Sequence, residues 1–179
     1  MCGAEVTGRV EAAWRVLDGV PDPEVPALSL RDLGIVREVA LEEAPDGGGE
    51  GPGLSVVLTP TYSGCPATEV IERSVVEALE TAGLGPVRIV TRRAPAWTTD
   101  WISDEGRRKL REYGIAPPGP VAPGAGVPVR LVRRAVEAVA CPRCGSAQTE
   151  RLSAFGSTAC KALWRCLACR EPFEHFKPI

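Results

Sequence analysis

The spacing of apolar residues predicts two amphipathic helices in the N-terminal half of the chain. Apolar positions recur at helical intervals from Val6 to Leu17, and Gly19 provides a stop. A second helix is predicted to start at Pro66, because proline suits the first helical position, and to end at Gly83. Its apolar face would consist of Ile71, Val75, Ala78, Leu79 and Ala82.

Three short segments predict β-strands. Residues 35–42 alternate apolar and polar side chains, and residues 54–59 and 87–91 are rich in β-branched residues. A glycine-rich stretch, residues 45–53, predicts a hairpin loop between the first two strands. The order helix, strand, strand, helix, strand predicts an α+β domain, in which a small three-stranded sheet has helices packed on one face.

Proline-rich segments divide the rest of the chain. Three prolines within residues 21–26 predict an extended loop that holds acidic side chains on a stiffened backbone. Ser103 precedes a third predicted helix, with acids in its first turn and bases later. Five prolines and three glycines in residues 116–129 predict a semi-rigid spacer. We therefore expect an α+β domain with a helical extension at 1–115, a linker at 116–135 and a separate module at 136–179.

Composition indicates a folded protein of the cytoplasm. The chain has 179 residues, of which 44% are hydrophobic and 25% charged. It contains no apolar run long enough to span a membrane, and its start does not have the pattern of a signal peptide. Four of its seven cysteines form two Cys-x-x-Cys pairs, which favours metal binding over disulfides.

The basic tail is a weak indication of nucleic-acid binding. The net charge is −2, but residues 130–179 carry 9 Lys and Arg against 4 Asp and Glu. A zinc ion held by four thiolates would contribute a net charge of about −2 and reduce this excess. Aromatic residues for base stacking are sparse in the tail, and Trp164 and Phe173 are better explained as core residues of this module. An ordinary solvated basic surface is therefore the preferred interpretation.

Two cysteine pairs in the tail predict a zinc ribbon, a small module built around a structural zinc site. Cys141 and Cys144 form the first pair, Cys166 and Cys169 form the second, and 21 residues separate the pairs. A module of this size gains much of its folding free energy from the metal. Iron in a rubredoxin-like site is the alternative. Removal of one ligand should unfold the module.

Two further side chains in this module could act as substitute ligands. Cys160 lies between the two pairs and His175 follows them, although a role in packing or in supporting the ligands fits both better. Cys2, at the start of the chain, receives no role.

Cys65 is the cysteine of interest in the first domain. If Pro66 begins the second helix, Cys65 lies at its cap, where the helix dipole and unpaired amides lower the pKa of a thiol. Such a thiolate could be a nucleophile or a metal ligand, but a small buried cap residue is an equal possibility. A cysteine hydrolase is disfavoured, because the single histidine, His175, belongs to the other module. Asp22 and Glu24 could join Cys65 in a mixed carboxylate and thiolate iron site, although solvated acids are the more ordinary interpretation.

Three motifs stand out in residues 6–92: Asp22-Pro-Glu-Val-Pro, Asp32-Leu-Gly-Ile and Thr59-Pro-Thr-Tyr-Ser-Gly-Cys-Pro. They resemble the MIP18 family, also called domain of unknown function 59, whose members are iron–sulfur assembly and targeting factors. Four motifs follow later in the chain: Trp97-Thr-Thr-Asp-Trp, Arg107-Arg-Lys-Leu-Arg-Glu-Tyr-Gly-Ile-Ala-Pro-Pro, Gly156-Ser-Thr-Ala-Cys-Lys-Ala-Leu and Glu171-Pro-Phe-Glu-His-Phe-Lys. With them, the whole chain is similar to the PaaD family, also called PaaJ, of the phenylacetyl-CoA 1,2-epoxidase system.

This resemblance implies an accessory protein of phenylacetate catabolism rather than an enzyme. Its partners would be the epoxidase subunits, a di-iron oxygenase and a flavin and iron–sulfur reductase, and it would help to insert iron or an iron–sulfur cluster into one of them. Cys65 matches the functional thiol of the family, and Asp22 and Glu24 match its acidic motif. Cys160 and His175 also match the tail pattern.

Two questions about the resemblance stay open. The protein could instead be a zinc-stabilised docking subunit whose paired tryptophans contact a partner. One functional thiol per chain would also suit a cluster that bridges a homodimer.

Overall fold

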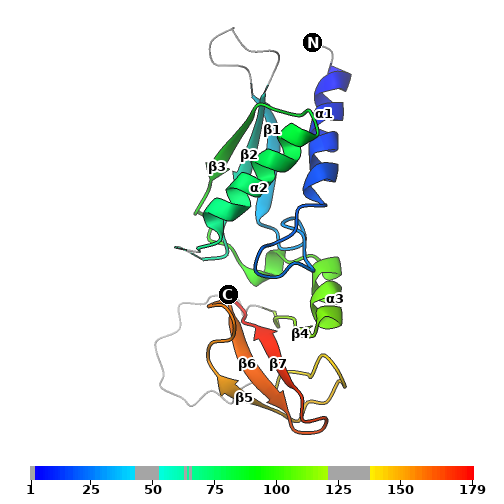
Figure 1. The fold of residues 1–179 in the computed structure, drawn as a ribbon, viewed down its shortest axis with the longest axis vertical. Helices are drawn as coiled ribbons and strands as arrows, with labels where there is room; N and C mark the ends of the chain where they lie inside the picture. The colour runs from blue at the N-terminus through cyan, green and yellow to red at the C-terminus, as the bar shows by residue number, and fades with distance from the viewer. Residues whose placement is uncertain (1–2, 43–52, 63, 65, 121–137) are drawn as a thin grey trace. The chain divides into compact units, whose positions relative to one another are not determined.

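The chain folds into two compact units. The first comprises Met1–Trp97 and Trp101–Gly106, and the second comprises Thr98–Asp100 and Arg107–Ile179. Figure 1 shows the fold of this computed structural model. The structure describes residues 3–42, 53–62, 64, 66–120 and 138–179. Most of the predicted loop at 45–53 and most of the predicted linker at 116–135 lie outside these ranges.

The first unit is the predicted α+β domain. Along the chain it contains α1 (Gly3–Leu17), β1 (Val36–Glu42), β2 (Gly53–Leu58), α2 (Thr68–Thr81) and β3 (Val87–Thr91). The sheet has the order β1-β2-β3. β1 and β2 pair antiparallel, whereas β2 and β3 pair parallel, so α2 forms the crossover between them.

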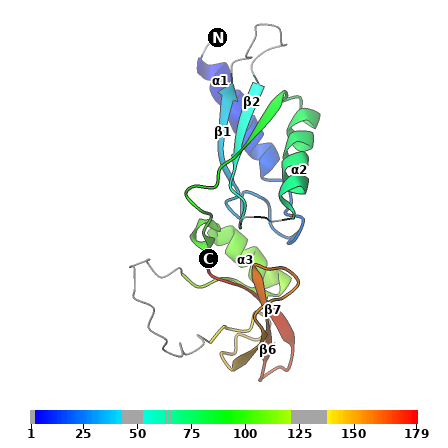
Figure 2. The same cartoon turned by 90° about the vertical axis from the view of Figure 1, so that its left-hand side faces the viewer.

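Both helices cover the same face of this sheet. α1 contacts β1 and α2, and α2 in turn contacts β3, so two helices that touch each other reach the two outer strands. Figure 2 shows α2 alongside the sheet. The helical face predicted for α2 is buried at Ile71, Val75 and Leu79. Leu54 and Val56 of β2, the middle strand, are fully buried as well.

The proline-rich loop before β1 is compact, so the prediction of an extended loop is wrong. Pro21 forms an isolated antiparallel bridge with Ser29, which brings the two ends of the loop together. The backbone N–H of Leu30 donates to the carbonyl of Val20 at 3.0 Å, and that of Asp22 donates to Leu28 at 2.8 Å. The prolines fix the backbone of a turn instead of holding it straight.

The second helix begins later than predicted. Its first residue is Thr68 and its N-cap is Ala67, whose φ of −76° and ψ of −10° are already helical. The N–H of Ile71 donates to the carbonyl of Ala67 at 2.9 Å. The N-cap is therefore Ala67, whereas we predicted Cys65 at the cap.

The motif Asp32-Leu-Gly-Ile holds the segment that follows the sheet. The indole N–H of Trp97 donates to the carbonyl of Leu33 at 2.9 Å, and the Trp97 side chain is buried. Gly34 has a φ of +68°, and a Cβ built there would lie 2.7 Å from the carbonyl oxygen of Trp101. Arg37 covers the Trp101 ring at 3.7 Å from its centroid. The paired tryptophans therefore contact their own unit.

The predicted third helix is confirmed as α3 (Asp104–Tyr113), which follows the short 3-10 helix η1 (Thr99–Trp101). The Ser103 hydroxyl accepts the backbone N–H of Gly106 at 2.9 Å, which is the geometry of an N-cap. Asp32 supports this cap, because its carboxylate accepts a hydrogen bond from the Ser103 hydroxyl at 3.2 Å.

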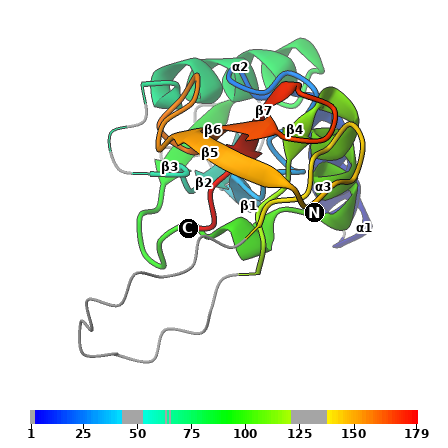
Figure 3. The same cartoon turned by 90° about the horizontal axis from the view of Figure 1, so that it is seen from below.

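The second unit contains a four-stranded sheet, part of which Figure 3 shows from below. Its strand order is β4-β7-β6-β5, and its strands are β4 (Ile115–Ala116), β5 (Thr149–Ser153), β6 (Lys161–Cys166) and β7 (Pro172–Phe176). β4 pairs parallel with β7. Residues 115 and 116 therefore belong to this sheet, whereas we predicted a domain end at 115 and a linker from 116.

The core of the ribbon lies on one face of β6 and β7. Trp164 and Phe173 pair across these strands, and both are buried, as the sequence predicted. Ala116, Ala162 and the two buried cysteines Cys141 and Cys166 complete the cluster. In the part of the chain that the structure describes, no helix is long and apolar enough to cross a lipid bilayer.

Candidate metal centre

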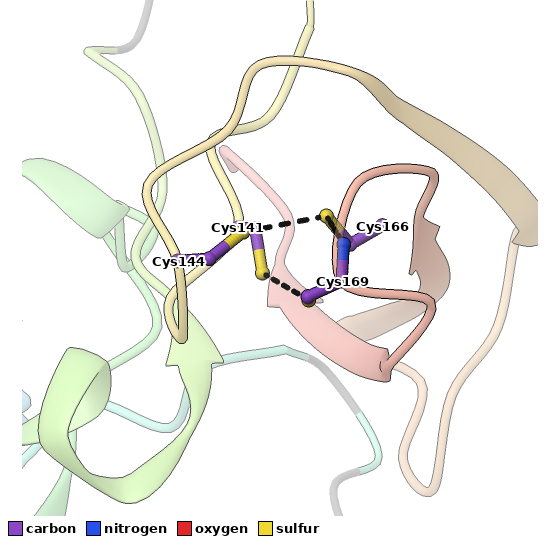
Figure 4. A group of neighbouring side chains, drawn as sticks. All are labelled: Cys141, Cys144, Cys166 and Cys169. Atoms are coloured by element: carbon purple, nitrogen blue, oxygen red, sulfur yellow. Dashed lines mark hydrogen bonds between the residues drawn. The ribbon is translucent and has the colours of Figure 1, made fainter.

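Four cysteine sulfurs from the two knuckles converge on one point of the second unit (Figure 4). The Sγ atoms of Cys141 and Cys169 are 3.8 Å apart, and those of Cys144 and Cys166 are 3.6 Å apart. All four lie within 4.8 Å of one another. Tetrahedral zinc with bonds of about 2.3 Å would separate its sulfurs by about 3.8 Å. The predicted ligand set therefore fits a tetrahedral metal ion.

The two knuckles have the same backbone structure. The N–H of Cys141 donates to the carbonyl of Ser146 at 3.0 Å, and the N–H of Cys166 donates to that of Glu171 at 3.0 Å. In each knuckle the residue after the second cysteine has a positive φ, 74° at Gly145 and 68° at Arg170. This conformation turns the chain so that both thiols of a pair face one point. Glycine at the first position, Gly145, adopts this conformation without strain.

The electrostatics of the cluster favour a bound cation. The backbone N–H groups of Cys169 and Ala168 donate to Cys166, and they lower the pKa of its thiol to about 6 against the opposing effect of burial. The pKa of Cys169 is raised to about 12, because burial and the neighbouring thiols outweigh a hydrogen bond from the backbone N–H of Glu171. Four thiolates at this spacing repel one another, and a cation between them removes that repulsion.

The centre connects the ribbon core to the surface. Cys141 and Cys166 are buried and belong to the core cluster, whereas Cys144 and Cys169 are exposed. One cysteine of each knuckle therefore packs inside and the other completes the site from outside. Four protein ligands leave no open position for substrate, which is the pattern of a structural site.

Cys160 and His175 lie outside the four-cysteine group. Cys160 is buried, and its Sγ is 3.0 Å from the Thr158 hydroxyl. His175 is buried on β7, with its ring edge-on to Trp164 at 5.9 Å between centroids. Burial lowers the pKa of His175 to about 4, so the imidazole is neutral at physiological pH. Both side chains are placed to support the ribbon core.

The predicted iron site in the first unit is described only in part. Cys65 lies outside the described residues. Asp22 is buried, and its Oδ1 accepts the backbone N–H groups of Glu24 at 2.9 Å and Val25 at 2.7 Å. This carboxylate therefore closes the turn of its own loop. Glu24 is half-buried in the same turn.

An ion pair in the ribbon was not predicted from the sequence. Lys161 is buried, with its Nζ 3.1 Å from the carboxylate of Glu174. Glu174 also accepts hydrogen bonds from the backbone N–H and the hydroxyl of Ser157. Burial opposes its ionisation, but the bonds from Ser157 and Lys161 prevail and lower the pKa of Glu174. Only the register between β6 and β7 brings these two charges together, so no short stretch of sequence carries a signal for the pair.

Two family models match the chain, one in each unit. The model described as "Iron-sulfur cluster assembly protein" matches residues 10–90. The model described as "PaaD zinc beta ribbon domain" matches residues 126–177, which include all four clustered cysteines.

Relatives of known sequence or structure agree with these matches. A putative 1,2-phenylacetyl-CoA epoxidase subunit of Escherichia coli strain K12 is 47% identical over 96% of this chain and 94% of its own length. The crystal structure of a domain of unknown function DUF59 from Bacillus anthracis covers 61% of this chain and 97% of its own, with a TM-score of 0.53 and 21% identity. At that identity the likeness shows the fold alone, and it confirms the fold predicted from the sequence. The identity with the Escherichia coli protein spans both units, so the chain belongs to the PaaD family of phenylacetyl-CoA epoxidase subunits.

Proposed function

We propose that this protein is an accessory subunit of a phenylacetyl-CoA epoxidase, and that it helps to insert iron or an iron–sulfur cluster into the oxygenase or its reductase. One observation carries the proposal. A domain of the iron–sulfur assembly type and a zinc ribbon occur in one chain that is 47% identical to a protein named as an epoxidase subunit.

The two units would divide the work. The ribbon's metal would have four thiolate ligands and no free position, so it would stabilise a module for docking and take no part in the reaction. The first unit would then bind the iron or cluster that is transferred, with Cys65 as the proposed ligand. Asp22 and Glu24 are the proposed carboxylate ligands, and one oxygen of Asp22 also accepts two backbone N–H groups.

The experiment compares two cysteine variants in a strain that depends on the epoxidase. Cys65→Ser is expected to yield epoxidase with low activity and a reduced iron content. Cys160→Ser is the matched control, because Cys160 is a thiol of the second unit outside the metal cluster. Fully active epoxidase with normal iron from the Cys65→Ser strain would refute the proposal.

A second candidate function is a non-catalytic docking subunit. The observation in its favour is the structural use of Asp22, whose carboxylate closes a turn although it belongs to the acidic motif. In this case the Cys65→Ser strain would behave as wild type, whereas loss of a zinc ligand such as Cys144 would abolish binding to the epoxidase subunits. Retained partner binding after loss of the zinc would exclude this candidate.

A further inference from the structure

The sheet of the first unit has one face that neither helix covers. Thr91 identifies the covered face, because its hydroxyl donates to Glu72 of α2 at 2.7 Å. Side chains alternate along each strand, and the register between strands assigns the remaining residues to the opposite face. We call this surface the open face; it consists of Glu38, Ala40, Glu42, Ser55, Val57, Arg88, Val90 and Arg92.

Charges on the open face are separated by sign. Both carboxylates belong to β1, and both guanidinium groups belong to β3 or follow it directly. Arg88 donates through Nε to Glu42 at 2.6 Å, and Arg92 lies 3.2 Å from Glu38. β2 is the middle strand, so each ion pair reaches across it and forms a dipole across the sheet. All four side chains are at least 36% exposed.

We propose that the open face binds the open face of a second copy of this chain. A two-fold axis parallel to the strands places β1 of each copy over β3 of the other. The carboxylates of β1 then lie over the basic strand of the second copy. Glu42 lies two residues along from its Arg88, and Glu38 lies between its Arg88 and Arg92. Each ion-pair dipole lies antiparallel to its counterpart, which is the self-complementarity that a two-fold interface requires.

The competing arrangement is repulsive. A two-fold axis across the strands would place β1 over β1 and β3 over β3, so that like charges would meet. Charge therefore selects one orientation of the two sheets. The residues between the charges, Ala40, Ser55, Val57 and Val90, are small, and Val57 is already buried within the chain. Two sheets at the usual distance of about 10 Å would therefore meet mainly through the charged side chains.

The size of the face predicts a weak dimer. Three strands spaced by about 4.8 Å, each with five or six residues rising about 3.3 Å, give a footprint of roughly 250 Å². This is small for a permanent dimer and fits a transient one with a dissociation constant of micromolar order or weaker. Its charged rim makes the association weaken with salt.

Charge reversal in the full-length, zinc-loaded protein tests the interface. Sedimentation equilibrium of the wild type at low salt should show a monomer–dimer equilibrium. Glu42→Arg alone and Arg88→Glu alone should each weaken dimerisation at least about tenfold, because like charges meet twice in each homodimer. An equimolar mixture of these two variants should dimerise again, since each variant supplies the charge that the other lacks. Native mass spectrometry of the mixture should identify the heterodimer.

An exposed ion pair in the ribbon provides a matched control. Glu150→Arg removes a comparable exposed ion pair with Arg165 in the ribbon and should leave the dimer unchanged. Glu38→Arg and Arg92→Glu provide a second complementary set if a first variant fails to fold. A wild type that stays monomeric up to about 1 mM, or a mixture that remains monomeric, would overturn the proposal. Equal weakening by Glu150→Arg would overturn it as well.

Discussion

Gly145 and Arg170 occupy the same position in the two metal knuckles, and both have a positive φ, 74° and 68°. Glycine adopts this conformation without strain, whereas a residue with a Cβ pays roughly 1–2 kcal/mol. Among the described residues Arg170 is the only non-glycine residue with positive φ. The second knuckle therefore holds strain that the first does not.

Substitutions at these two positions should have opposite effects on zinc affinity. Gly145→Ala should weaken zinc binding about fivefold to thirtyfold, because it introduces the same strain at a site with no neighbouring atoms to contact. Arg170→Gly should tighten binding by at most about fivefold, because the greater flexibility of glycine in the unfolded chain offsets part of the relieved strain. Competition with a chelator measures both. Tighter binding by Gly145→Ala would contradict the assignment of strain.

The pair formed by Lys161 and Glu174 should respond asymmetrically to loss of one partner. Glu174→Gln leaves a buried ammonium group without its counter-charge and should destabilise the protein by about 3 kcal/mol. Lys161→Met should cost much less, because Glu174 keeps its two hydrogen bonds from Ser157. Chemical denaturation of the zinc-loaded protein compares them, and equal losses would show that the charge of Lys161 is not buried as described.

Two substitutions of Asp22 distinguish a structural role of its carboxylate from a role as an iron ligand. Asp22→Asn keeps an oxygen that can accept the N–H groups of Glu24 and Val25, so the melting temperature should stay close to that of the wild type. Asp22→Ala should lose about 1–2 kcal/mol, because buried N–H groups would then lack acceptors. If Asp22→Asn abolishes epoxidase maturation while the fold is intact, the carboxylate is an iron ligand in addition to closing the turn.

Acid should destabilise the ribbon through His175. Burial lowers the pKa of this imidazole to about 4, whereas its ordinary value is 6.5. Between these values the unfolded chain binds a proton that the folded chain does not, so stability falls as the pH decreases from about 6.5 toward 4. His175 is the single histidine, so its ring signals can be followed by NMR without assignment. Titration near 6.5 in the folded protein would contradict its burial.

Helices and strands were predictable where buried residues recur at a regular spacing along the sequence. The buried positions of α2 recur at helical spacing, and the third predicted strand, Val87–Thr91, matches the observed one. The four cysteines were predictable because spacing alone brings two knuckles to one ion. In both cases the signal lies within a short stretch of sequence.

Features that depend on distant contacts could not be predicted. β4 has two residues, Ile115 and Ala116, and it is a strand only because β7, far along the chain, offers it a partner. The turn at Asp22 depends on hydrogen bonds that its carboxylate accepts from the next residues. The number of prolines in the segment gives no information about these bonds. The open face of the first sheet likewise depends on register, which brings Glu42 of β1 within reach of Arg88, two residues along β3.

Metal analysis after anaerobic purification tests the central claim, the division of labour between the two units. We predict one zinc per chain in the wild type and in Cys65→Ser, with substoichiometric iron in the wild type alone. Cys144→Ser should lose the zinc, and Cys160→Ser should keep both metals. Iron that persists at the wild-type level in Cys65→Ser, or that is lost in Cys144→Ser together with the zinc while the first unit stays folded, would contradict the account.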